Sequence, residues 1–191
     1  MNQLIKTALI SAIILSSTAC APAALVVGAT AGGAIIYDKR SMKTMSEDQT
    51  ATHYAQRWID HDPILSKKGN VTVTVFNHVA LLVGETQNTQ IKQRASDIMS
   101  RIKNVQKTYN AITIAGSETH LEHASDAWLT AKVRSTLLVK GGLNSNDIKI
   151  VTEKGVVYLM GAPTHEQAAL ATNAARRVSG VNKVVKVFIY E

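Results

Sequence analysis

The sequence has one cysteine, few aromatic residues and no apolar run near its start that is long enough to cross a membrane. A lone cysteine, Cys20, forms no disulfide bond within the chain, so oxidation is not what stabilises the fold. Aromatic residues make up 5% of the 191 residues, and only Trp58 and Trp128 are tryptophans. The apolar run at residues 8–15, broken only by Ser11, is too short for a stable transmembrane helix.

Signatures of catalysis are also missing. The sequence contains no glycine-rich phosphate loop, no GxSxG nucleophile elbow and no motif of paired carboxylates. His120 and His123 have a spacing that suits metal ligands on a helix, but spacing places no third ligand, so we predict no metal site. With 46% apolar and 18% charged residues, the composition is that of a folded globular protein. We therefore expect a non-enzymatic protein without a cofactor.

The chain is basic, with a formal net charge of +7 and a pI near 9.6. Such a balance favours an anionic partner, which is either nucleic acid or an anionic lipid surface. The N-terminus distinguishes the two, because Lys6, the apolar run and the small residues 16–19 have the layout of a secretory signal. Export from the cytoplasm argues against nucleic acid and favours lipid.

The end of this signal, Ser17-Thr18-Ala19-Cys20, resembles the lipobox of bacterial lipoproteins, with Ser17 where leucine is usual. The resemblance implies a signal peptide at residues 1–19 and covalent lipid on Cys20, whose acyl chains together give stable anchoring. Simple signal cleavage is the alternative. Because Ala21 follows the cysteine, the resemblance favours the outer membrane, with the chain lipid-anchored on its periplasmic face.

Residues 21–36 are small, apolar and uncharged. We interpret residues 20–45 as a tether near the membrane, with the folded part beginning near Ser46. Helix packing through glycines at close spacing is the alternative interpretation of this segment. The glycines concerned are Gly28, Gly32 and Gly33.

An internal repeat organises the rest of the chain, because residues 70–84 and 147–161 match in register. Each segment is an alternating apolar run, a two-residue turn and a second apolar run that ends on glycine. This pattern predicts a β-hairpin in each copy. The turns are Asn77-His78 and Lys154-Gly155, and the final glycines are Gly84 and Gly161.

Helical periodicity precedes and follows each hairpin, and a third strand closes each unit. The expected helices before the hairpins lie at 48–60 and 125–139, and the third strands at 105–114 and 181–190. Thr164 with Gln167 forms a capping-box pattern, and Thr86 with Thr89 is a weaker counterpart. The sequence thus predicts an α+β fold of two tandem α-β-β-α-β domains, each a three-stranded sheet packed against two helices. Their expected bounds are 46–115 and 125–191, with a linker at 116–124.

The repeated unit resembles the BON domain, a small module of bacterial periplasmic and outer-membrane proteins. The resemblance rests on the strands that end in glycine, 79–84 and 156–161, and on the turn into the third strand at 178–184. The first copy reads Ile102–Lys107 at that turn and lacks the glycine, so its helix must end differently. Resemblance over nearly all of residues 46–191 implies a protein that binds anionic phospholipid without catalysis.

The helix at 125–139 carries the candidate binding site. Three apolar residues at helical spacing form its predicted core stripe: Leu129, Val133 and Leu137. With about 100° of rotation per residue, Trp128 lies roughly 140° from the centre of that stripe, beside Lys132 and Ser135. An indole favours the level of lipid headgroups and a cation pairs with phosphate. Arg134, on the flank of the helix, adds a second phosphate contact.

The family resemblance extends to this helix, where Asp126-x-Trp128 and residues 132–138 match the lipid-contacting element and add Leu138 to the site. The implied ligand is phosphatidylglycerol or cardiolipin. The alternative is that Trp128 packs against the first domain or caps a core edge. The alternative function is a periplasmic adaptor that docks an envelope assembly or division protein through the same surface. A structural protein without a specific ligand is a third possibility.

The first helix of the first copy is expected to differ from its counterpart. Its predicted core stripe is Thr52, Ala55 and Ile59. Trp58 lies only about 60° from that stripe, which predicts that it packs inward. The two copies are therefore expected to present a tryptophan only from the second domain.

Overall fold

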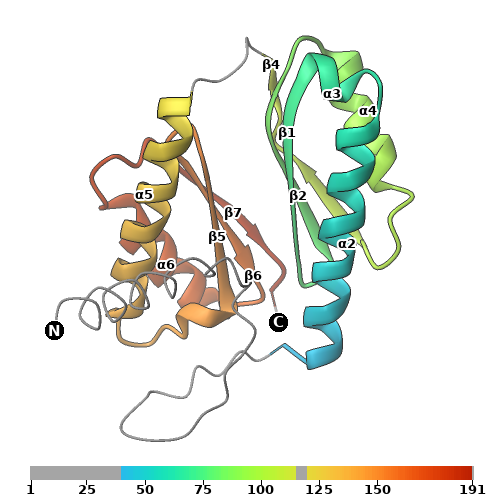
Figure 1. Cartoon of the computed structure of the whole chain (residues 1–191). Coiled ribbons are helices and arrows are strands. Elements are labelled where there is room, and N and C mark those ends of the chain that lie inside the picture. The colour runs from blue at the N-terminus through green and yellow to red at the C-terminus, as the bar shows by residue number, and fades with distance from the viewer. Residues whose placement is uncertain (1–39, 115–119, 191) are drawn as a thin grey trace, which may run out of the picture. The chain divides into compact units, whose positions relative to one another are not determined.

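The computed structural model describes residues 40–114 and 120–190, without the side chains of 120–124 and 145. The predicted signal, Cys20 and the predicted tether up to residue 39 lie outside the described residues, so these features remain predictions. The α+β class and the two tandem α-β-β-α-β units are confirmed, and Figure 1 shows both units.

The first domain contains one short helix that the sequence did not predict. Its elements are α2 (Met42–His61), α3 (Leu65–Lys68), β1 (Gly69–Phe76), β2 (Val79–Thr86), α4 (Thr89–Met99), β3 (Lys107–Asn110) and β4 (Thr113–Ile114). Helix α2 starts ahead of Ser46 because Ser41 caps it, its hydroxyl oxygen accepting from the backbone N–H of Thr44 at 3.0 Å. Just ahead of the helix, Arg40 forms an ion pair with Asp48, with 2.9 Å between its Nη1 and the carboxylate Oδ2.

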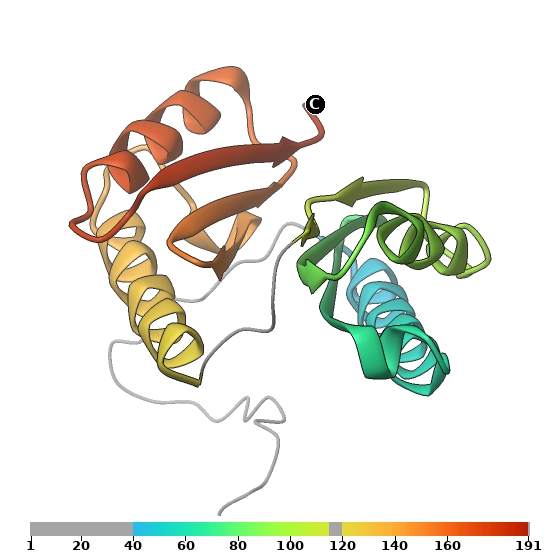
Figure 2. The same ribbon diagram turned by 90° about the horizontal axis from the view of Figure 1, so that it is seen from above.

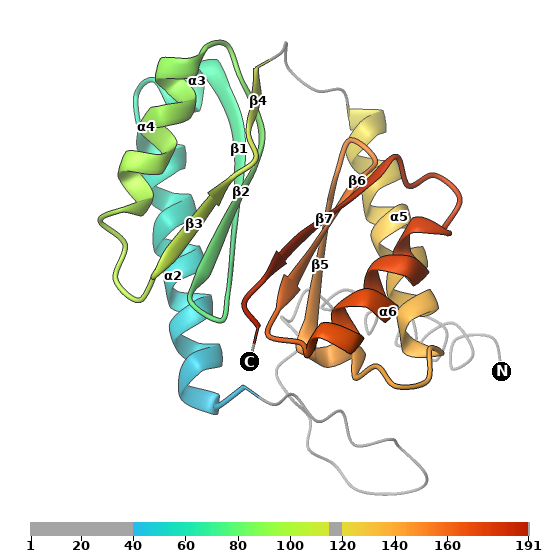
Figure 3. The same ribbon diagram turned by 180° about the vertical axis from the view of Figure 1, so that it is seen from behind.

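The second domain repeats this order and is shown from behind in Figure 3. Its elements are α5 (His120–Leu138), the short 3₁₀ helix η1 (Ser145–Asp147), β5 (Ile148–Glu153), β6 (Val156–Gly161), α6 (His165–Arg176) and β7 (Lys183–Phe188). The third strand is continuous here.

The two sheets share the strand orders β1-β2-β3 and β5-β6-β7, but the first has a fourth strand, because β4 also pairs parallel to β2. The first two strands of each pair antiparallel, and the third pairs parallel to the second. A parallel neighbour requires a crossover connection, which α4 and α6 provide. In each domain the two helices lie on the same side of the sheet (Figure 2).

The predicted strand at 105–114 is divided into β3 and β4 by Asn110. Its side-chain amide donates to the carbonyl of Lys92 at 3.0 Å and to Ser96 Oγ at 2.7 Å, and its side-chain oxygen accepts from the N–H of Ile112 at 3.1 Å. These bonds bend the chain so that Ile112 enters the core. A short polar side chain that bonds its own backbone thus interrupts the strand.

The predicted two-residue turns are confirmed. Asn77 and His78 have φ values of 51° and 59°, and Lys154 and Gly155 have 50° and 73°. Two successive residues with positive φ match the right-handed twist of a hairpin.

An aspartate on the first helix of each domain holds this turn in place. The carboxylate of Asp48 accepts from the N–H groups of Asn77 and His78 at 2.7 and 2.9 Å. The carboxylate of Asp126 accepts from the N–H groups of Lys154 and Gly155 at 2.5 and 2.9 Å. Both aspartates are buried. Asp126 and Asp48 therefore set the same register between helix and hairpin.

The glycines that end both hairpins are required by close strand contact. Gly84 has a φ of 113°, and a Cβ there would collide with the backbone carbonyl of Asn70 on the neighbouring strand. Gly161 has a φ of 151° and is blocked in the same way by the carbonyl of Asp147. The matching glycines in the sequence thus mark the same backbone constraint.

The chain leaves α4 and α6 through equivalent left-handed residues. Gly180 has a φ of 100°, and Asn104 takes its place in the first domain with a φ of 66°. Asparagine is among the few residues that tolerate this conformation, which explains how the first copy manages without the family glycine. The predicted capping box of Thr164 and Gln167 is confirmed. The predicted cap in the first copy is wrong, because Asn88 caps α4 and Thr86 ends β2.

Each domain has a core of its own between its helices and its sheet. In the first, α2 and α4 pack on β1 and β2 through buried residues such as Ala55, Leu82 and Met99. In the second, the predicted stripe Leu129, Val133 and Leu137 is buried on β5 and β6, as expected. Neither of these two cores contains a residue of the other domain.

The second face of each sheet carries further buried apolar side chains. They form a third cluster with residues from β1, β2, β6 and β7: Phe76, Val79, Leu81, Val83, Tyr158, Met160 and Val187. The outward positions of β1 and β5 are more polar, and Thr72 and Lys149 are exposed.

Candidate lipid-binding surface

The outward face of α5 presents apolar side chains to solvent. Trp128 is 61% exposed and Leu138 is 60% exposed, although Leu129 and Leu137 beside them are buried. Exposed apolar side chains that share one face of a helix mark a candidate interaction surface. The prediction that Trp128 points outward is confirmed, and the alternative that it caps a core edge does not fit this exposure.

Lys132 lies against Trp128 in a defined position. Its Nζ is 4.3 Å from the centroid of the indole ring and donates to the carbonyl of Ser179 at 3.1 Å. A cation over an indole face is attracted by the ring electrons. The ammonium group has three donors, so further ones remain for an anion.

The five predicted site residues share the solvent-facing half of α5. Ser135 is at its centre, Trp128 and Leu138 lie on either side of it, and Lys132 and Arg134 lie on opposite flanks. Ser135 Oγ donates to the carbonyl of Lys132 at 2.9 Å, so it acts on a ligand only as an acceptor. The structure thus brings Lys132 to Trp128 and leaves Arg134 apart from both.

Arg134 faces the side of α5 next to strand β5. Desolvation, and after it the positive charges of Arg134 and Arg40, lower the pKa of Lys149 on that strand. The flank of α5 that carries Arg134 is therefore electropositive.

The prediction that Trp58 packs inward is wrong. Trp58 is 47% exposed, because the buried stripe of α2 consists of Asp48, Ala51, Ala55 and Ile59. The predicted stripe member Thr52 lies at the strand side of that stripe, where its Oγ1 accepts from the N–H of Val75 at 3.0 Å. The stripe is thus turned toward β1, and Trp58 is left on the opposite flank.

The two first helices are equivalent position by position. Counting from the turn-holding aspartates, the buried residues Ala51, Ala55 and Ile59 match Leu129, Val133 and Leu137. The flank that faces the loop after the second helix, which we call the loop-side ridge, is then Thr50, Tyr54 and Trp58 on α2 and Trp128, Lys132 and Thr136 on α5. Each domain therefore exposes one tryptophan on its loop-side ridge. Alignment of the two aspartates in the sequence would have revealed this.

No cluster of three or more potential metal ligands occurs among the described residues. The side chains of His120 and His123, the only metal candidates in the sequence analysis, lie outside them.

None of the helices within residues 40–114 and 120–190 is both long enough and apolar enough to cross a membrane.

Comparisons with known proteins agree with this architecture. The family model described as "BON domain" matches residues 56–116 and 125–191. The outer membrane lipoprotein DolP of Haemophilus influenzae is 30% identical over 168 residues, which are 88% of this chain and 87% of that protein. The 21 kDa hemolysin of Actinobacillus pleuropneumoniae is 29% identical over 153 residues, 80% of this chain and 79% of that protein.

Among solved structures, the C-terminal domain of CdsD, the structural protein of the type III secretion system of Chlamydia trachomatis, covers 75% of this chain. The alignment covers 67% of that chain at 9% identity with a TM-score of 0.30, which is too low to support a comparison of function. The two matches to the family model and the likeness to DolP are sufficient to assign the family without the solved structures. The chain is an outer-membrane protein of the BON-domain family, with two BON domains.

Proposed function

We propose that this chain is a lipid-anchored, non-enzymatic protein that binds anionic phospholipid through the outward face of α5 and so supports envelope integrity. The observation that carries the proposal is the pair formed by Trp128 and Lys132, an exposed indole with an ammonium group 4.3 Å from its ring centroid. The likeness to an outer membrane lipoprotein gives the setting in which such a pair meets lipid.

Each residue of the face has a distinct part in this binding. The indole of Trp128 lies at headgroup level, where its apolar ring and polar N–H are both satisfied. Lys132, positioned by the ring and by Ser179, pairs with a lipid phosphate. Arg134 offers a fork of donors to a second phosphate on the other flank. Leu138 adds apolar contact at the end of the helix.

The contact through α5 is weak by itself. Each cation near an anionic surface contributes about 1 kcal/mol, and salt screens this contribution. Acyl chains on Cys20 would supply stable anchoring, since several chains together hold a protein at a membrane. The α5 face then selects among lipids and favours phosphatidylglycerol or cardiolipin over zwitterionic lipid.

Co-sedimentation with vesicles tests the proposal. A fragment of residues 40–191 keeps both cores and omits the acylated cysteine, which would bind any vesicle. We expect this fragment to sediment with vesicles that contain phosphatidylglycerol and to stay in solution with phosphatidylcholine alone. Trp128→Glu should abolish sedimentation. Gln90→Glu, which adds the same charge at an exposed position of α4, should leave it unchanged.

The same experiment separates the alternative function. If the folded wild-type fragment binds neither vesicle, the lipid mechanism is wrong and an adaptor role on the same surface takes its place. A charge reversal at Lys132 refines the distinction, because it should abolish lipid binding but leave a protein interface centred on Trp128 partly intact.

A further inference from the structure

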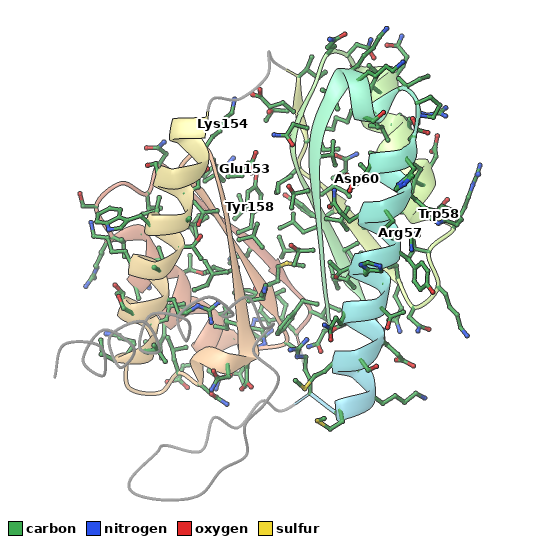
Figure 4. All side chains as sticks on the ribbon, viewed as in Figure 1. Arg57, Trp58, Asp60, Glu153, Lys154 and Tyr158 are labelled. Atoms are coloured by element: carbon green, nitrogen blue, oxygen red, sulfur yellow. The ribbon has the colours of Figure 1, made fainter. Side chains whose placement is uncertain are left out.

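The loop-side ridge of the first domain also bears exposed aromatic side chains. Tyr54 is 53% exposed and Trp58 is 47% exposed, one helical turn apart on α2. Tyr54 stands at the position equivalent to Lys132, and Trp58 stands two turns along from the position equivalent to Trp128. Figure 4 shows Arg57 and Trp58 on the side of α2 that faces away from its sheet.

The surface beside these rings is hollowed. One hollow of about 450 Å³ lies on one side of Trp58 and extends to Arg57, His61 and Ile98. A second of about 260 Å³ extends along Thr50 toward Lys103 and Asn104. Both are lined by Tyr54, Trp58 and Arg101. The two hollows adjoin these shared side chains, and together we call them the first-domain groove.

The groove is rich in positive charge that has no carboxylate partner. Arg57, Arg101 and Lys103 are exposed, and within the part of the chain that the structure describes none of them lies within 4.0 Å of a carboxylate. The one acid in its lining, Asp62, is already held by Arg94 at 2.7 Å. A ligand in the groove therefore meets two aromatic rings and three available cations.

We propose that the first-domain groove binds the headgroup of an anionic phospholipid, as a second site independent of α5. Arg57 and Arg101 contact the phosphate from the two walls of the groove, since guanidinium forks match phosphate oxygens. Tyr54 and Trp58 contact the glycerol and the start of the acyl chains, where aromatic side chains are favoured.

The choice of lipid as the occupant rests on the charge of the groove and on the location of the protein. The three cations complement a phosphate, and a protein of the outer membrane meets lipid phosphates at the membrane surface. The groove also lies along the loop-side ridge of α2, which is equivalent to the ridge of α5 that carries the Trp128 and Lys132 pair. An acidic protein segment is the other chemistry that such a surface accepts, and the experiment distinguishes it.

The two tryptophans make each site separately observable, because the chain has no others. In the 40–191 fragment, Trp128→Phe leaves Trp58 as the only indole, and Trp58→Phe leaves Trp128. We expect vesicles of phosphatidylethanolamine with phosphatidylglycerol carrying brominated acyl chains to quench and blue-shift the emission of Trp58. Vesicles in which brominated phosphatidylcholine replaces the anionic lipid should not do so.

A matched pair of double variants tests the groove cations in the Trp128→Phe background. Arg57→Glu with Arg101→Glu should weaken the vesicle-dependent quenching of Trp58 by about ten-fold or more, since two attractions become repulsions. Lys67→Glu with Lys68→Glu changes the net charge equally at exposed positions of α3 outside the groove, and should have a much smaller effect. Circular dichroism checks that all variants are folded.

Each other result overturns the proposal in a recognisable way. Quenching of Trp128 without quenching of Trp58 leaves the α5 site intact and removes the groove site. Equal loss in both double variants shows unspecific attraction to charge. A shift of Trp58 emission by inorganic phosphate as large as that by vesicles assigns the groove to free phosphate. A shift by polyglutamate but not by vesicles assigns it to an acidic protein partner.

Discussion

At the scale of single residues, the aspartates on the two first helices explain how a small domain keeps its parts in register. Asp126 lies two residues before Trp128, and the family resemblance alone would have placed both in the lipid-contacting element. In the structure, Asp126 is buried and bonded to the β5–β6 turn, whereas Trp128 is exposed to solvent. Neighbours in sequence thus have separate tasks because they face opposite sides of a helix.

Asp126→Ala should destabilise the second domain. The substitution removes a buried acceptor and leaves the N–H groups of Lys154 and Gly155 without their partner. We expect a loss of about 1.5–3 kcal/mol in the free energy of unfolding, the range for hydrogen bonds to a charged group. Urea unfolding followed by circular dichroism measures it. An unchanged unfolding midpoint would show that the turn holds without the carboxylate.

The ion pair of Asp62 and Arg94 gives a prediction at acid pH. The hydrogen bond from Arg94 is the main cause that lowers the pKa of Asp62 from 3.8 to about 2. A carboxyl group with a lowered folded-state pKa stabilises the fold above its unfolded pKa, and this contribution is lost as the pH falls through the folded value. Stability should therefore fall between about pH 4 and pH 2, and Asp62→Asn should remove that part of the fall. The midpoint of thermal unfolding is measured for the wild type and for Asp62→Asn across this pH range. Parallel plots of midpoint against pH would contradict the assignment of this loss of stability to Asp62.

At the scale of elements, α5 has a buried face and an exposed face, and adjacent leucines separate them. Leu137 is fully buried in the second core and Leu138 is 60% exposed. Leu137→Ala should cost about 2–5 kcal/mol of unfolding free energy, as is usual for a buried leucine. Leu138→Ala should change stability by less than about 0.5 kcal/mol. Chemical denaturation of both variants provides the comparison.

Vesicle binding should show the opposite order for the same two variants. At a temperature where both are folded, Leu138→Ala should weaken co-sedimentation with phosphatidylglycerol vesicles and Leu137→Ala should not. If Leu138→Ala sediments as the wild type does, the end of α5 lies outside the lipid contact.

Periodicity predicted the elements correctly where the local sequence pattern alone determined the structure. The alternation of apolar residues and the paired glycines predicted both hairpins, and the predicted apolar stripe of α5 was correct to the residue. The division of β3 from β4 was missed because it depends on bonds from Asn110 to α4, which no local pattern reveals. The exposure of Trp58 was missed because a shift of the stripe by one residue changes which flank is buried.

At the scale of the whole molecule, two copies of one domain present related but different surfaces. Each domain exposes a tryptophan on the helix that opens it. The net charge of +7 favours anionic surfaces for the chain as a whole. With the proposed lipid anchor and the two proposed contacts, the protein would sample a membrane and stay longer where anionic lipid is dense.

The emission of Trp128 in the Trp58→Phe fragment tests the central claim most directly. The measurement follows this single indole as vesicles with brominated phosphatidylglycerol are added at low salt, and then as sodium chloride is raised. We predict a blue shift with quenching that salt reverses and that brominated phosphatidylcholine does not produce. An emission spectrum that stays that of a solvated indole with both lipids, in a protein that remains folded, would contradict lipid binding by α5.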